Sequence, residues 1–263
     1  MLPLLVLGDS SAVTVGVLDR KDTFGARLAK ELVSDLSCAV EVRVQARVGV
    51  TTAGMARQVR AVCGRSDRGV VLVLIGGNDV VLPKSLRRSA AQLGSYVGEL
   101  RAAGWQVVVG SCADIGAAPA VRPGVAAVAM WRSRWLARRQ AAAVLEAGGL
   151  VVSLTTDVFR HRPADLYCAD GFHPSAEGYF HYFQRLSVGV LEAARRWQCG
   201  EVPAAEGDIV VKSVKGASRQ VVREPGACFI PAPSQDQVVL RRYVPATDCA
   251  RQETAAGLTS AVS

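Results

Sequence analysis

"LVLGDSSAVTVGV", residues 5–17, sets the frame for the whole chain. An apolar run over residues 4–7 stops abruptly at Gly8, Asp9 and Ser10, and a second apolar stretch follows soon after. Such a run predicts a buried β-strand. The Gly-Asp-Ser sequence after it fits a plain turn or a helix N-cap. It also fits a reactive serine held where a strand ends, and the rest of the sequence decides between these alternatives.

Strand-like and helix-like segments alternate along most of the chain. The predicted strands are residues 3–7, 40–46, 69–77, 105–111 and 149–154. The predicted helices are residues 23–36, 52–63, 84–103, 124–147 and 175–197. This alternation indicates an α/β domain over residues 1–199, with a mostly parallel sheet covered by helices on both faces. Ligands of such folds bind beyond the carboxyl ends of the strands, where Ser10 would lie.

The composition changes after residue 199. Pro and Gly become frequent, with short Val-rich pieces at residues 208–211 and 237–244 and no visible helical period. We therefore expect residues 200–263 to form a C-terminal extension with a few short strands, followed by a disordered end from about residue 250.

Charge and cysteine usage argue against several classes of function. The net charge is +8, but the basic residues are scattered and accompany no nucleic-acid-binding motif, so no nucleic-acid partner is expected. The seven cysteines show no C-x-x-C spacing, and no phosphate-binding or dinucleotide-binding glycine motif occurs, so no metal and no cofactor are expected. The widely spaced cysteines, the lack of a convincing signal peptide and the absence of a membrane-spanning run predict a cytoplasmic protein.

His173 is the candidate for acid–base chemistry. It lies in CADGFHPSAEGY, and Asp170 precedes it by three residues. In a turn, this spacing lets the carboxylate accept from the imidazole Nδ1–H, which fixes the tautomer and stabilises the imidazolium. Serine is the natural nucleophile for such a base. The other histidines, His161 and His181, are interpreted as surface or packing residues.

Four short motifs follow one another at the predicted strand ends and before the last helix: GDS (8–10), RVGVTTAGM (47–55), IGGNDV (75–80) and DGFHP (170–174). Each alone is compatible with a turn or a cap. As an ordered set over residues 3 to about 197, they resemble the SGNH, or GDSL-like, hydrolase superfamily, in particular its bacterial lipase and esterase members. Ser11 stands where the family name has leucine. The resemblance implies a three-layer α/β/α fold with a flavodoxin-like, five-stranded parallel sheet.

The resemblance also implies roles for individual residues. Ser10 matches the nucleophile, His173 the base and Asp170 the residue that orients it. The oxyanion donors would be the Ser10 N–H, the Gly49 N–H and the Asn78 amide, and Asp9 and Asp79 would brace loops. The implied activity is a serine esterase acting on small-molecule or lipid esters. An acyltransferase with the same triad and a non-catalytic binding protein are the alternatives, and the oligomeric state stays open.

Residues 131–139 have two interpretations. Trp131, Trp135 and Leu136 would line an acyl groove, with the neighbouring arginines (132, 134, 138 and 139) attracting an anionic head group. The alternative, which we favour, is a helix with one apolar face against the sheet and one solvated basic face.

Overall fold

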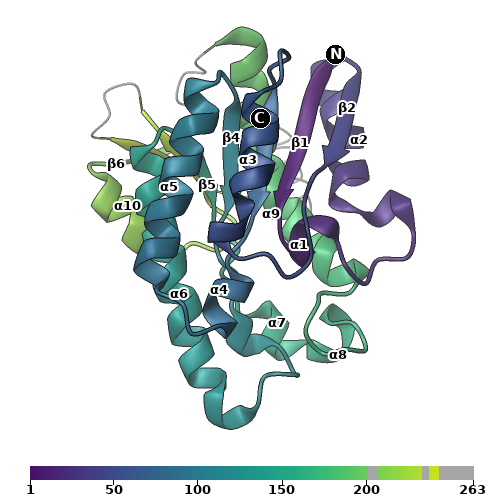
Figure 1. Ribbon diagram of the computed structural model, residues 1–263, viewed down its shortest axis with the longest axis vertical. Helices are drawn as coiled ribbons and strands as arrows, with labels where there is room; N and C mark the ends of the chain where they lie inside the picture. The colour runs from purple at the N-terminus through teal and green to yellow at the C-terminus, as the bar shows by residue number, and fades with distance from the viewer. Residues whose placement is uncertain (201–206, 233–236, 243–263) are drawn as a thin grey trace, which may run out of the picture.

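A mostly parallel β-sheet runs through the computed structural model, which describes residues 1–200, 207–232 and 237–242 (Figure 1). The parallel strands stand in the order β2-β1-β3-β4-β5, which confirms the flavodoxin-like prediction. Their bounds are β1 (Leu2–Gly8), β2 (Val40–Val44), β3 (Val70–Leu74), β4 (Gln106–Gly110) and β5 (Leu150–Val152).

Helices cover both faces of the sheet, as the alternating pattern predicted. One face packs against α2 (Phe24–Leu36) and α9 (Ala176–Cys199). The other packs against α3 (Ala56–Cys63), α5 (Leu86–Ala102) and α6 (Pro123–Glu146). Side chains alternate across a strand, so β1 sends Leu5 and Leu7 into one core and Leu4 and Val6 into the other. Short helices and 3₁₀ turns lie in the loops: α1 (Ser10–Val13), η1 (Arg20–Asp22), η2 (Thr52–Met55), α4 (Gly77–Val81), η3 (Ile115–Ala117), α7 (Val158–His161) and α8 (Pro163–Leu166).

The C-terminal extension continues the sheet, so the sheet has eight strands in the described part of the chain rather than five. Three antiparallel strands follow β5 in the order β7 (Cys228–Pro231), β8 (Val238–Arg241) and β6 (Ile209–Val211). A helix, α10 (Val214–Gln220), packs against α6. This helix shows no helical period in the sequence because it is only seven residues long. The predicted disorder from about residue 250 lies outside the described residues, and the division at residue 199 stays a prediction.

Buried charges fasten the extension to α9. The Glu192 carboxylate is almost fully buried and accepts from Arg196 and Arg241, each at 2.7 Å. Arg241 also pairs with the buried Asp208 at 2.8 Å. A buried carboxylate needs such partners, because its desolvation is otherwise unfavourable.

Among the described residues, none of the helices is long and apolar enough to cross a bilayer.

Candidate active site

Gly8 ends β1 at a point where two backbones nearly touch. Its φ is +134°, and a Cβ there would lie 1.8 Å from the Leu74 carbonyl oxygen. Only glycine fits this position without moving β3. The chain therefore leaves β1 at a fixed angle, and Ser10 follows two residues later.

Two buried glutamines hold the strand ends, and neither role could be predicted from the sequence. Gln58 on α3 accepts from the Gly8 N–H at 2.9 Å and donates to the Gly8 carbonyl at 3.0 Å. Gln140 on α6 accepts from the Cys112 N–H at 2.8 Å and donates to the Ile75 carbonyl at 3.0 Å. Backbone groups at the ends of β1, β3 and β4 are thereby satisfied by side chains.

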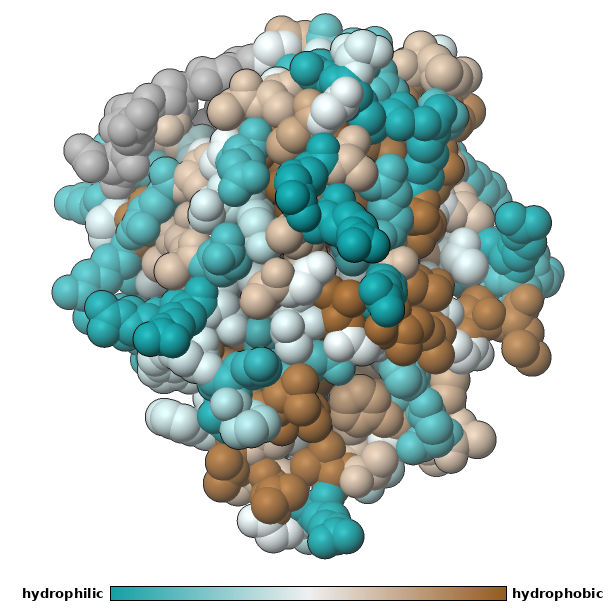
Figure 2. Space-filling view, viewed as in Figure 1, coloured by the Kyte–Doolittle hydropathy of each residue, from teal (hydrophilic) through white to brown (hydrophobic). Residues whose placement is uncertain are grey.

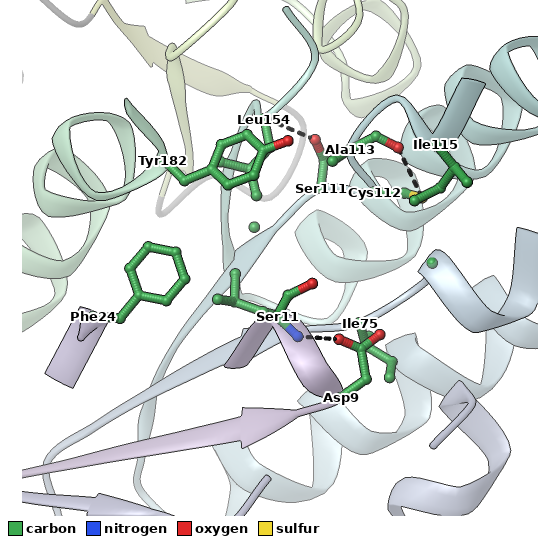
Figure 3. A pocket seen from close by; sticks show the side chains of 13 residues that line it. Asp9, Ser11, Phe24, Ile75, Ser111, Cys112, Ala113, Ile115, Leu154 and Tyr182 are labelled. Atoms are coloured by element: carbon green, nitrogen blue, oxygen red, sulfur yellow. Dashed lines mark hydrogen bonds between the residues drawn. The ribbon is translucent and has the colours of Figure 1, made fainter. Parts of the chain in front are cut away.

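Ser10 is the first residue of α1, and the residue before it caps this helix. The Asp9 carboxylate accepts from the Ser11 N–H at 2.9 Å, as Figure 3 shows beside a small cavity of about 40 Å³. Burial raises the pKa of Asp9 to about 6, although the hydrogen bonds from Ser11 oppose this. No described residue accepts from the Ser10 N–H. Asp9 thus braces the turn, as predicted, and the Ser10 amide is left for a ligand.

His173 and Asp170 are hydrogen-bonded, as their spacing predicted. The His173 Nδ1 lies 2.6 Å from Asp170 Oδ2, and Asp170 Oδ1 accepts from the backbone N–H groups of Phe172 and His173. These hydrogen bonds lower the pKa of Asp170 to about 2, and the bond with the His173 imidazole has the largest effect. The carboxylate is therefore ionised at neutral pH and holds the Nδ1 side of the imidazole in place.

The turn that carries His173 is fixed on both sides. The Cys168 N–H donates to the His173 carbonyl at 2.8 Å, and the Ala120 N–H donates to the Gly171 carbonyl at 2.9 Å. Helix α9 then begins after Ser175, whose hydroxyl accepts from the Gly178 N–H at 3.2 Å. Pro174 lies directly before this cap, so the helix begins after the proline.

Asn78, on α4, ties together the loops after β2 and β3. Its Nδ2 donates to the Val50 carbonyl at 2.9 Å, which leaves its second amide hydrogen for another acceptor. Gly49, the residue before Val50, has a φ of +78° and no atom within 4 Å of where a Cβ would stand. Asp79 braces the same loop, since its Oδ2 accepts from both the N–H and the hydroxyl of Thr52.

One cavity of about 50 Å³ brings together Ser10, Asn78 and His173. The structure shows no hydrogen bond between the Ser10 hydroxyl and His173, a common condition before a substrate binds. Gly49 does not line this cavity, and it precedes Val50, whose carbonyl accepts from Asn78. Among the described residues, no three His, Cys, Asp or Glu side chains are placed to hold a metal ion.

The basic and aromatic stretch of α6 is buried on one side, while Trp131 is 62% exposed. Leu136 is fully buried in the core, and Arg132 donates to the carbonyls of Val80 and Leu82. The Arg139 guanidinium lies over the Trp135 ring, 4.8 Å from its centroid. His161 at the end of α7 is exposed, and His181 lies on α9 near Glu177, so neither belongs to the cavity.

Comparison with known proteins gives one family. The model of the GDSL-like Lipase/Acylhydrolase family matches residues 6–180. The chain is 35% identical over 181 residues to the GDSL-like esterase Rv1075c of Mycobacterium tuberculosis; the match covers 67% of this chain and 57% of that protein.

Solved structures share the fold. A lipolytic G-D-S-L family protein from Veillonella parvula has a TM-score of 0.56 at 18% identity, over 74% of this chain and 100% of that one. The psychrotrophic esterase EstA from Pseudoalteromonas has a TM-score of 0.53 at 15% identity, over 74% of this chain and 98% of that one.

Proposed function

Because the chain belongs to the GDSL-like lipase/acylhydrolase family, we propose that it is a serine esterase that cleaves carboxylic esters through an acyl-enzyme on Ser10. One observation carries the proposal. The imidazole of His173, oriented by Asp170 at 2.6 Å, lines the same cavity as Ser10 and Asn78. These are the nucleophile, base and donor that acyl transfer requires.

In the proposed reaction, the Ser10 oxygen attacks the ester carbonyl carbon while His173 Nε2 takes the hydroxyl proton. The carbonyl oxygen becomes an oxyanion, which accepts from the Ser10 N–H, the Gly49 N–H and the free amide hydrogen of Asn78. The C–O bond to the alcohol then breaks, and His173 donates its proton to the leaving alkoxide. Water, deprotonated by His173, attacks the acyl-enzyme and releases the acid and free Ser10.

The placement of the donors supports this assignment. Helix α1 starts at Ser10, so the Ser10 N–H is among the amides that a helix leaves without an internal acceptor. The Asn78 amide is held by Val50, and donors fixed in advance lose little when charge develops.

The central test replaces the nucleophile. Ser10→Ala should abolish hydrolysis of p-nitrophenyl esters and labelling by a fluorophosphonate, with little change in the circular dichroism spectrum or the urea midpoint. Ser34→Ala, an exposed serine on α2, is the matched control and should leave both activities intact. Turnover retained by Ser10→Ala would exclude the covalent mechanism.

An acyltransferase would use the same residues, with an alcohol in place of water. Adding alcohol or sugar acceptors to the wild-type reaction separates the two activities. An esterase should release free acid at a rate that the acceptors barely change, whereas an acyltransferase would give mainly the new ester.

A further inference from the structure

An apolar groove of about 590 Å³ opens beside the catalytic cavity. Its walls come from the end of α4 and the residues after it, from the start of α6, and from Phe172. Figure 2 shows hydrophobic residues gathered at the corresponding lower end of the molecule. The reaction steps described above leave this groove without a role.

The groove and the catalytic cavity are neighbours, because Ile115 and Phe172 line both. Phe172 directly precedes His173, and the two rings lie edge to face with centroids 5.3 Å apart. Helix α4 also links the cavity and the groove. Asn78 near its start lines the cavity, and Val80 and Val81 at its end line the groove. The start of the groove wall thus lies only two residues along α4 from Asn78.

The chemistry of the walls favours a hydrocarbon. Val81, Leu82, Val125 and Val128 are 59%, 41%, 53% and 56% exposed, although all four are apolar. The groove has no Asp or Glu among its lining residues. Contiguous exposed apolar residues of this kind mark binding sites rather than ordinary surface.

Arg132, a charged residue of the wall, is already engaged. Its guanidinium donates to the carbonyls of Asp79, Val80 and Leu82 and so closes the end of α4. Arg122, the other charged residue of the wall, is exposed, and the remaining lining side chains are apolar, so the groove offers few groups for a sugar hydroxyl to bond. It offers instead a surface from which a chain of methylene groups would displace water.

We propose that this groove binds the acyl chain of the ester whose carbonyl is attacked by Ser10, so that the protein prefers medium and long acyl chains over acetyl. This inference rests on the proposed esterase function and names its substrate class. Full burial of a methylene group changes an equilibrium about fourfold, so partial burial in an open groove should raise kcat/KM about twofold for each added methylene.

The test compares p-nitrophenyl acetate, butyrate, octanoate and decanoate, which share one leaving group. For the wild type, kcat/KM should rise with chain length. The double variant Val125→Asp/Val128→Asp places charge in the groove at exposed positions, where folding is little affected, and should lower the octanoate-to-acetate ratio at least tenfold. Val33→Asp is the matched control, because Val33 is a 46% exposed valine on α2, away from the groove. It should leave the ratio unchanged.

Two further measurements keep this inference separate from the esterase proposal. Octanoate should bind Ser10→Ala in isothermal titration calorimetry, and should bind the same protein carrying the two aspartates at least tenfold more weakly. A wild type that hydrolyses none of the esters would refute the esterase function. Octanoate binding would then test separately whether the groove binds an acyl chain. An active wild type whose ratio is unchanged by the double variant would overturn the groove assignment. The second measurement uses alkyl acetates, in which the alcohol chain varies and the acyl group stays acetyl. If kcat/KM rose with the length of the alcohol chain but not with that of the acyl chain, the acyl assignment would be overturned.

Discussion

Asn78→Ala gives the sharpest test of the proposed oxyanion site. The asparagine amide has two hydrogens, and one is used to hold the Val50 carbonyl at 2.9 Å. The substitution therefore removes the donor that we assign to the oxyanion and also loosens the loop that carries Gly49. Neither change alters the triad, because His173 and Asp170 are held by other contacts.

The expected loss has two parts. Removal of one oxyanion donor lowers kcat by about 10²–10³-fold, or about 3–4 kcal/mol of transition-state stabilisation. Loss of the bond to Val50 removes about 1 kcal/mol, the net value of an ordinary hydrogen bond, and weakens the placement of the Gly49 N–H. The bond to Val50 is also present in the ground state, so only its effect on the Gly49 N–H adds to the loss in rate, and kcat should fall about 10³-fold, at the upper end of the range. KM should change little, because the developing charge exists only in the transition state.

The assay measures kcat and KM with p-nitrophenyl butyrate, together with unfolding in urea. Thr52→Val is the control for the loop, since Thr52 donates its hydroxyl to Asp79 at 3.0 Å and supplies no donor to the oxyanion. It should lower stability by about 1 kcal/mol with a much smaller effect on kcat.

Two results would refute the reasoning. A rise in KM with unchanged kcat would make Asn78 a residue for ground-state substrate binding. Equal losses of kcat in Asn78→Ala and Thr52→Val would show that the loop position, not the amide donor, controls the rate.

Three more predictions concern the rest of the molecule. Asp170→Asn should lower kcat by up to about 10⁴-fold, the loss known for this change in a serine protease triad, because an amide favours the wrong imidazole tautomer; kcat at neutral pH checks this, and a loss below tenfold would contradict it. The pKa of Asp9 is raised from 3.8 to about 6, so its contribution to stability is fully present below pH 4 and is lost as the pH rises through 6. The free energy of unfolding of the wild type minus that of Asp9→Asn should therefore fall by roughly 2 kcal/mol from pH 4 to pH 7, and a rise would reverse the assignment. Phe229→Ala should cost about 3–5 kcal/mol in urea unfolding, because Phe229 on β7 is fully buried, and a cost below 1 kcal/mol would mean that the extension packs loosely.

The family and the parallel sheet could be predicted because their signals are local. Each parallel strand is an apolar run in the sequence, and each motif follows a strand or precedes the last helix. The match over residues 6–180 confirms the family. The pairing of His173 with Asp170 was equally accessible, because the two residues are three apart and one turn brings them together.

What was missed depends on contacts between distant segments. Gln58 lies 50 residues from Gly8, and nothing around it in the sequence marks a glutamine that will hold a strand end. Strand β7 is four residues long, lies between prolines and glycines, and pairs with β5 more than 70 residues earlier. The acyl groove combines segments near residues 81, 125 and 172, so no single stretch of sequence shows it.

The added strands change which backbone faces solvent at one side of the sheet. Without them, β5 would be an edge strand of three buried apolar residues, an unpaired template for another chain. With them, the last strand on that side is the short β6, and at the other side β2 carries the charged residues Glu41 and Arg43. The extension therefore protects the protein against edge-to-edge aggregation, and a chain ending at residue 199 should scatter light at concentrations where the full chain stays monodisperse.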